Sequence, residues 1–190
     1  MKPILWSGTM KLAALLLIAG CAAQPKAAAD PGSPLKATEA FIDAFYSFKP
    51  EPLRNALADA PSSAPVILFY QGWAEGGNYA VVERKPCRLE GTDEVACDIK
   101  VRDDFIAALG TGYDVTDTFH LTFKEGRIVE ARTSSNDPPQ FNEALKWVNA
   151  QHPELMEGPC RGFFAGGPTP QDCARAVAKG FRDYRARPRS

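Results

Sequence analysis

The chain has 190 residues, of which 45% are hydrophobic and 24% are charged, and its formal net charge at pH 7 is −1. These proportions are ordinary for a globular protein and exclude a low-complexity or collagen-like chain. The near-zero net charge argues against a nucleic-acid-binding protein, which needs an excess of basic side chains. The length beyond the leader and linker described next, about 150 residues, suits a single domain.

The first 20 residues have the pattern of a bacterial lipoprotein signal peptide. Lys2 and Lys11 precede the apolar run 12–20, which is too short to span a bilayer. The run ends Leu17-Ile18-Ala19-Gly20-Cys21, which resembles the bacterial lipobox. The resemblance implies that the leader is removed and that Cys21 carries a diacylglycerol with palmitate-type chains. The alternative is an ordinary secretory signal that happens to contain a cysteine.

The residues after Cys21 suggest where the protein is held and how. Ala22 is not acidic, and by resemblance to enterobacterial sorting rules this favours the outer membrane, with the domain facing the periplasm. Residues 21–36 contain three prolines and few large apolar side chains. Such a segment cannot bury enough surface to become ordered, so it predicts a flexible tether between the lipid and the domain.

Four cysteines remain after Cys21, which is an even number in an oxidising compartment and favours disulfides. Of the three pairings open to them, the sequence favours the one that joins neighbours: Cys87 with Cys97 and Cys160 with Cys173. A zinc site needs closely spaced cysteine or histidine pairs. The cysteine spacings are too long, and His120 and His152 are isolated, so we expect no metal and no cofactor.

The domain begins with three predicted helices. Thr38 can cap the first helix, which ends at Pro50. The second runs over 53–60, and the third runs over 66–79 with Gly76-Gly77 marking its end. The apolar positions of the third helix are Val66, Phe69, Tyr70, Trp73 and Ala74.

The hydrophobic pattern then changes to a period of two, which predicts antiparallel strands. The predicted strands cover 80–89, 95–101, 115–123 and 128–134. A helix follows Pro138-Pro139 and ends at His152-Pro153, and a last helix covers 171–187 after a glycine- and proline-rich loop at 158–170. The order of helices, about four strands and helices predicts an α+β layer, with helices on one face of a curved antiparallel sheet.

Three local strings carry a family resemblance: Phe69-Tyr70-Gln71-Gly72-Trp73-Ala74, the Phe119–Ile128 hairpin, and Phe141 to Glu154 around Trp147. With the order of elements, they resemble the nuclear transport factor 2-like (SnoaL-like) superfamily. The resemblance covers about residues 37–155 and implies a cone-shaped interior for the domain, 37–157. The stapled segment 158–190, with its extra C-terminal helix, lies outside the family pattern and is expected to form an added cap.

The residues that suggest chemistry lie among the predicted helices and strands. A ligand pocket for an apolar molecule can be lined by aromatic residues, although such residues more often form plain core. The candidates are Tyr46, Tyr70, Trp73 and Tyr79. Asp117 shares strand parity with Val115 and Phe119. It either points into the cone, where burial would raise its pKa and suit it as a base, or lies solvated at the strand start. His120 has the opposite parity and is expected on the outer face.

Three functions remain open, because fold alone does not decide function. The first is a lipid-anchored envelope protein that binds a small apolar ligand or a protein partner in or over its cone. The second is a SnoaL-like isomerase or cyclase, for which Asp117 is the one catalytic candidate. The third is an envelope scaffold that forms a homodimer through its sheet. An enclosed, partnered carboxylate in a deep pocket favours the enzyme, and a cone plugged by Phe and Trp favours the scaffold.

Replacing the proposed lipid-bearing cysteine tests the anchor. Cys21→Ser should move the protein from the membrane fraction to the soluble fraction, because two buried acyl chains are what hold it there. Fractionation followed by immunoblotting measures this. A mutant that stays with the membrane as the wild type does would show that the anchor is assigned wrongly.

Overall fold

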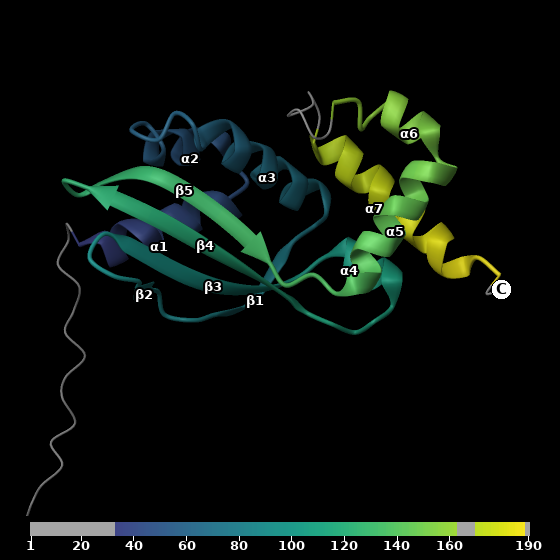
Figure 1. The fold of residues 1–190 in the computed structure, drawn as a ribbon, viewed down its shortest axis with the longest axis horizontal. Helices are drawn as coiled ribbons and strands as arrows, with labels where there is room; N and C mark the ends of the chain where they lie inside the picture. The colour runs from purple at the N-terminus through teal and green to yellow at the C-terminus, as the bar shows by residue number, and fades with distance from the viewer. Residues whose placement is uncertain (1–32, 163–169, 189–190) are drawn as a thin grey trace, which may run out of the picture.

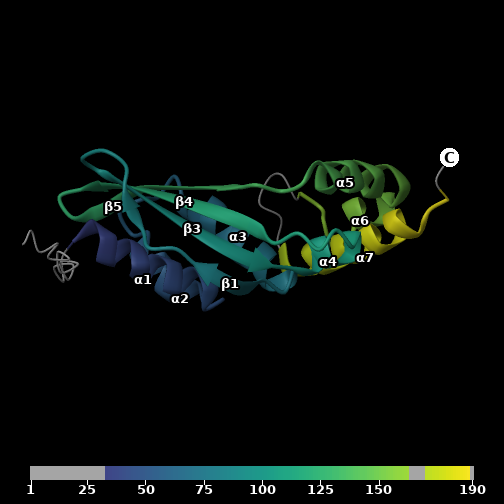
Figure 2. The same ribbon diagram turned by 90° about the horizontal axis from the view of Figure 1, so that it is seen from below.

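The computed structural model describes residues 33–162 and 170–188. The proposed signal peptide, Cys21 and most of the proposed tether lie outside these residues. In Figure 1 the N-terminal helices lie along an antiparallel sheet, and the later helices gather beyond one end of its strands. Figure 2 shows the same division from below, with the sheet running lengthwise toward the helical end. The fold is therefore α+β with a curved, open antiparallel sheet.

The first helix, α1 (Pro34–Tyr46), begins earlier than the sequence pattern indicated. Ser33 caps it by accepting a hydrogen bond from the backbone N–H of Lys36, and Pro34 fits the first turn because it has no N–H to satisfy. The prediction that Thr38 caps the helix is wrong. Thr38 is buried inside the helix, and its hydroxyl donates to the Pro34 carbonyl at 2.8 Å. Helix α1 thus includes residues 34–36, which the sequence assigned to the proposed tether.

The next two helices also differ from the prediction in their bounds and faces. Helix α2 (Pro50–Ala56) begins at the proline that was expected to end α1. Helix α3 (Ala64–Gly76) exposes Val66 and Tyr70, whose relative exposures are 53% and 43%. Its buried residues are Ile67, Gln71, Gly72, Trp73, Ala74 and Gly76.

The orientation of α3 depends on a buried polar residue, Gln71, which is not among the apolar positions of the predicted helix. The Gln71 side-chain amide donates to the carbonyls of Ala44 and Phe45, at 3.0 Å each. Carbonyls in the last turn of a helix have no partner within that helix, and a buried amide needs acceptors. Gln71 therefore fixes α3 against the end of α1.

The sheet has the order β1-β3-β4-β5, and the short β2 also pairs with β3. The strands are β1 (Ala80–Arg84), β2 (Arg88–Leu89), β3 (Glu94–Arg102), β4 (Val115–Lys124) and β5 (Arg127–Ser135). The expected strand over 80–89 is split into two, because Pro86 between the two pieces has no N–H for the ladder. In the β4–β5 turn, Glu125 and Gly126 both have positive φ, as a two-residue hairpin turn requires.

The period-two pattern in β4 is confirmed. Its odd-numbered residues, Val115 to Phe123, are all buried, and they pack with β3 and the helices α1 to α3 in one core. His120 lies on the opposite, outer side of the same strand, half-buried.

A second core lies at the helical end of the molecule. It joins α4 (Asp104–Leu109), α5 (Pro139–Gln151) and α7 (Pro170–Ala186), with α6 (Pro153–Glu157) packed beside them. Phe105 stacks on Trp73 with ring centroids 4.7 Å apart and meets Phe181 edge-on at 5.8 Å. Because Trp73 belongs to α3, the C-terminal segment shares this core with the rest of the domain.

Both predicted disulfides are confirmed. Cys87 pairs with Cys97 and ties the chain between β1 and β2 to β3. Cys160 pairs with Cys173 and ties the chain after α6 to the start of α7.

Removing the second disulfide should destabilise the helical end. The bridge closes a loop with a sequence separation of 13. A loop of this size contributes about 3 kcal/mol in the chain-entropy model. The double variant Cys160→Ser/Cys173→Ser should therefore melt at lower temperature than the wild type. An unchanged melting curve would show that packing alone holds α7.

Gly180 tests the close approach of α5 and α7. A Cβ at position 180 would lie 2.7 and 2.9 Å from the two methyl carbons of Val148. Gly180→Ala should lower the free energy of unfolding by about 1–3 kcal/mol, although alanine alone favours a helix by about 1 kcal/mol.

The matched experiment repeats Gly180→Ala in a Val148→Ala background, where the obstructing methyl groups are absent. There the same substitution should be neutral or stabilising. Urea unfolding of the four proteins measures the coupling. Equal effects of Gly180→Ala in both backgrounds would contradict the proposed contact.

Candidate functional site

A cavity of about 290 Å³ lies where the inner face of the sheet meets α3 and α5. Apolar side chains from several elements form most of its wall, including those of Tyr70, Trp73, Phe119, Phe141 and Leu145. The polar part of the wall comes from the ends of β4 and β5, with Asp117, Asp137 and the hydroxyls of Thr133, Ser134 and Ser135. The cavity is therefore an aromatic space with carboxyl groups on one side.

Asp117 is the most enclosed polar group of this wall. Its relative exposure is 8%, and its Oδ2 accepts a hydrogen bond of 2.9 Å from the Tyr46 hydroxyl. Burial raises the pKa of Asp117 to about 7. The hydrogen bond from Tyr46 opposes this rise, while the nearby Asp137 and Asp103 add to it. Asp117 is therefore a carboxyl group that changes its charge near neutral pH.

The four aromatic candidates for the ligand pocket do not all lie on the cavity wall. Tyr70, Trp73 and Tyr79 line the cavity. Tyr46, the last residue of α1, is not on the wall but reaches it through its hydrogen bond to Asp117. Burial and the Asp117 carboxylate raise the pKa of Tyr46 far above its usual value, so the phenol remains protonated and serves as a hydrogen-bond donor.

Two further carboxyls belong to this neighbourhood. Asp137 follows β5 and lines the cavity, and burial raises its pKa. Asp103 is buried as the N-cap of α4, where its Oδ1 accepts from the Ile106 backbone N–H at 2.8 Å, and burial raises its pKa to about 6. The strand and loop patterns gave no sign that Asp137 would lie near Asp117.

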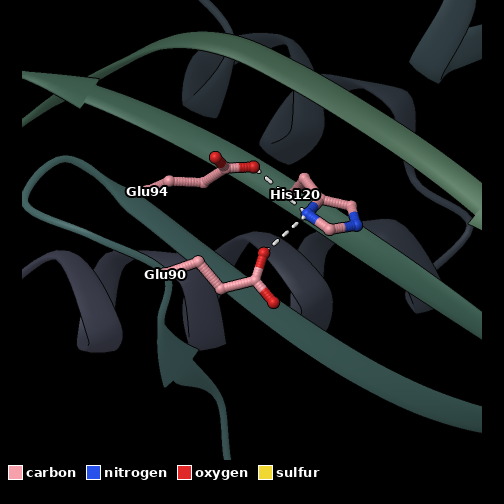
Figure 3. Close-up of side chains that lie close together, drawn as sticks. All are labelled: Glu90, Glu94 and His120. Atoms are coloured by element: carbon pink, nitrogen blue, oxygen red, sulfur yellow. Dashed lines mark hydrogen bonds and ion pairs between the residues drawn. The ribbon is translucent and has the colours of Figure 1, made fainter.

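On the outer face, His120 is not isolated as expected. Its Nδ1 lies 3.2 Å from Glu90 and 3.1 Å from Glu94, and Figure 3 shows the imidazole between the two carboxylates. Within the described residues, this is a group whose atoms lie close enough together to hold a metal ion.

Two arginines already bind the same carboxylates. Arg132 Nη2 lies 2.7 Å from the Glu94 oxygen that faces His120, and Arg88 Nη2 lies 3.0 Å from Glu90. A metal ion would have to share the Glu94 oxygen with the Arg132 guanidinium and would bind a Glu90 carboxylate that is already paired with Arg88. We therefore interpret the cluster as an ion-pair network that ties the β2–β3 turn to β4 and β5, and assign no metal to it.

Comparison with protein-family models, with curated proteins and with solved structures finds no match to this chain. Across residues 33–162 and 170–188, no helix is both long enough and apolar enough to cross a membrane. The function is therefore inferred from the cavity and its carboxyl groups.

The raised pKa of Asp117 predicts how stability changes with pH. The pKa in the folded protein, about 7, lies above the value of about 3.9 for an unfolded chain. The folded state thus binds this proton more tightly, and the associated stability is present below about pH 4 and lost as the pH rises to about 7. Each unit of the difference corresponds to about 1.4 kcal/mol.

Asp117→Asn should remove part of this loss, since the amide cannot ionise but still offers an oxygen to Tyr46. Asp103 should cause a smaller loss of the same sign in both proteins. Urea unfolding from about pH 4 to 8 measures the difference. A variant whose stability falls as steeply as that of the wild type would show that Asp117 is already ionised at low pH.

Asp98→Asn is the matched control on the outer face. Burial would raise the pKa of Asp98, but hydrogen bonds from Arg88 and Thr118 bring it below its usual value. The ionised Asp98 therefore contributes stability at neutral pH, and this contribution is lost on acidification, opposite to that of Asp117. Asp98→Asn should therefore lower stability at neutral pH and leave the loss between about pH 4 and 7 in place.

Proposed function

We propose that this chain is a lipid-anchored protein of the cell envelope, held at the outer membrane through Cys21, whose cavity binds a small, largely apolar molecule. The observation that carries the proposal is an aromatic cavity with Asp117 in its wall, where the carboxyl group accepts a hydrogen bond from Tyr46 behind it. Its volume, about 290 Å³, is at the lower end of the range for small-molecule sites. A ligand of one or two rings fits such a space.

The proposal includes the SnoaL-like fold. The support is the α+β order, with the N-terminal helices along a curved antiparallel sheet (Figure 1), together with the cavity on the inner face of that sheet. The family resemblance of the three sequence strings points the same way.

The scaffold alternative has less support. The outer face of the sheet carries ion pairs such as Arg88–Asp98, Lys100–Glu83 and Arg132–Glu94. A homodimer through that face would have to remove these charges from water, which is unfavourable. The interior also contains open space between Trp73 and Phe141, rather than being completely filled by aromatic side chains.

A second candidate function is proton transfer by Asp117 in a SnoaL-like isomerase or cyclase. The observation that favours it is the enclosure of a carboxyl group with a pKa of about 7, hydrogen-bonded to a tyrosine. A carboxylate of this basicity is well suited to remove a proton from carbon next to a carbonyl group at neutral pH.

Binding of 2-naphthol to the full chain tests the cavity, with isothermal titration calorimetry as the measurement. Wild type should bind it, and Leu145→Trp should abolish binding by filling the space. Lys146→Trp, one residue along α5 at an exposed position, is the matched control and should bind as the wild type does. If wild type does not bind, or if Leu145→Trp binds equally well, the cavity is not the binding site.

Exchange of the α-hydrogens of cyclohexanone in deuterated water tests proton transfer. The Asp117 carboxylate would take one α-proton and leave the enolate, which then accepts a deuteron. The enzymatic rate should rise with pH through about 7 as Asp117 ionises. Asp117→Asn should lower it by about 100-fold or more. Equal rates for wild type, Asp117→Asn and protein-free solution would remove the enzyme as a candidate.

A further inference from the structure

The cavity has an unbalanced negative charge. Two carboxyl groups, Asp117 and Asp137, lie on its wall, and Asp103 is near enough to raise the pKa of Asp117. Within the part of the chain that the structure describes, the wall contains no lysine, arginine or histidine. Inside a protein, buried carboxylates normally have a cationic partner, because an unpaired charge in a low-dielectric environment is costly.

The carboxylates on the outer face of the same sheet provide the contrast. Asp98 is paired with Arg88, and Glu94 is paired with Arg132. Arg84 acts electrostatically on Tyr46 but is itself held by Glu39 and Asp43. Among the described residues, the outer carboxylates thus have basic partners, whereas no ion pair joins Asp117 to a basic side chain.

The rest of the wall also suits a cation. Trp73, Tyr70, Tyr79, Phe119 and Phe141 place aromatic rings around the carboxyl groups. The face of an aromatic ring attracts a positive charge, and the attraction is stronger when the pair is removed from water. An aromatic wall and carboxylates together can hold a cationic head group and its apolar body at once.

We propose that the ligand of this cavity is an organic cation, an apolar molecule whose protonated amine or quaternary ammonium group lies between Asp117 and Asp137. The inference deepens the proposed binding function and rests on it. With a neutral ligand, Asp117 would either stay protonated or be ionised without a cationic partner. A cationic ligand supplies the positive charge that the wall lacks. The ligand is thereby assigned to a chemical class that the shape of the cavity alone does not indicate.

Cation binding is coupled to proton release. The titratable groups that face Asp117 are Tyr46 from α1, Tyr79 before β1, Asp103 before α4 and Asp137 after β5. The two phenols stay protonated, so the carboxyl groups respond to the ligand. A permanent cation prefers the ionised carboxylate, and its affinity should rise with pH and level off above about 7.

The test compares phenyltrimethylammonium with tert-butylbenzene, which have the same shape and differ in charge. Titration calorimetry on the full chain at about pH 8 should show that the cation binds at least about tenfold more tightly. This preference should shrink at about pH 5.5, while the affinity for tert-butylbenzene should not change with pH.

Three variants test which carboxyl group is responsible for the preference for the cation. Asp117→Asn should lose the preference for the cation and keep its affinity for tert-butylbenzene within about twofold, which also shows that the variant is folded. Asp137→Asn, at the less buried carboxyl, should lose part of the preference. Asp98→Asn, on the outer face, should bind both probes as the wild type does.

The outcomes separate this inference from the proposed function. Equal affinities for the two probes in the wild type would overturn the charge inference while leaving a cavity that binds apolar molecules. If neither probe binds, the proposed function and the inference fail together. A preference for the cation that survives in both Asp117→Asn and Asp137→Asn would place the binding elsewhere and overturn the inference.

Discussion

The hydrogen bond from Tyr46 to Asp117 connects the parts of this molecule on which its site depends. Strict alternation along β4 places Asp117 in the same inward row as Phe119 and Leu121, where an apolar side chain would be more stable. A carboxyl group can occupy such a place only with a partner or with its proton retained. The structure has both, since Tyr46 donates to one oxygen and burial raises the pKa to about 7.

The position of Tyr46 depends in turn on how the helices are held. It is the last residue of α1, and the carbonyls just before it accept hydrogen bonds from Gln71 of α3. Helix α3 also packs closely against α7. The two helices approach so closely at Gly76 that a side chain there would collide with the backbone of Gln171. The disulfide Cys160–Cys173 secures the start of α7. The C-terminal segment thus supports the wall of the cavity.

The sequence predicted those features that depend on local pattern. Alternation placed Asp117 and His120 on opposite faces of β4, and cysteine spacing indicated both disulfides. The sequence did not predict the hydrogen bond between Tyr46 and Asp117. The two residues are 71 positions apart, and neither the helix pattern around Tyr46 nor the strand pattern around Asp117 indicates the other residue. The buried role of Gln71 was missed for a related reason, since a polar residue counts against a helix face unless its distant acceptors are known.

The two candidate activities make different demands on the same carboxyl group. A bound cation stabilises the carboxylate and lowers the pKa of Asp117, so a cation-binding site works best when the group stays ionised. A general base must instead accept a proton and release it, which is easiest when its pKa stays near the pH of the reaction. Without a cation on its wall, the cavity by itself satisfies the second demand, and an organic cation would convert it to the first. Under the two proposals, the charge of the ligand would decide the role of Asp117: a cationic ligand would be held by the carboxylate, and a neutral ring with an acidic carbon would meet a base.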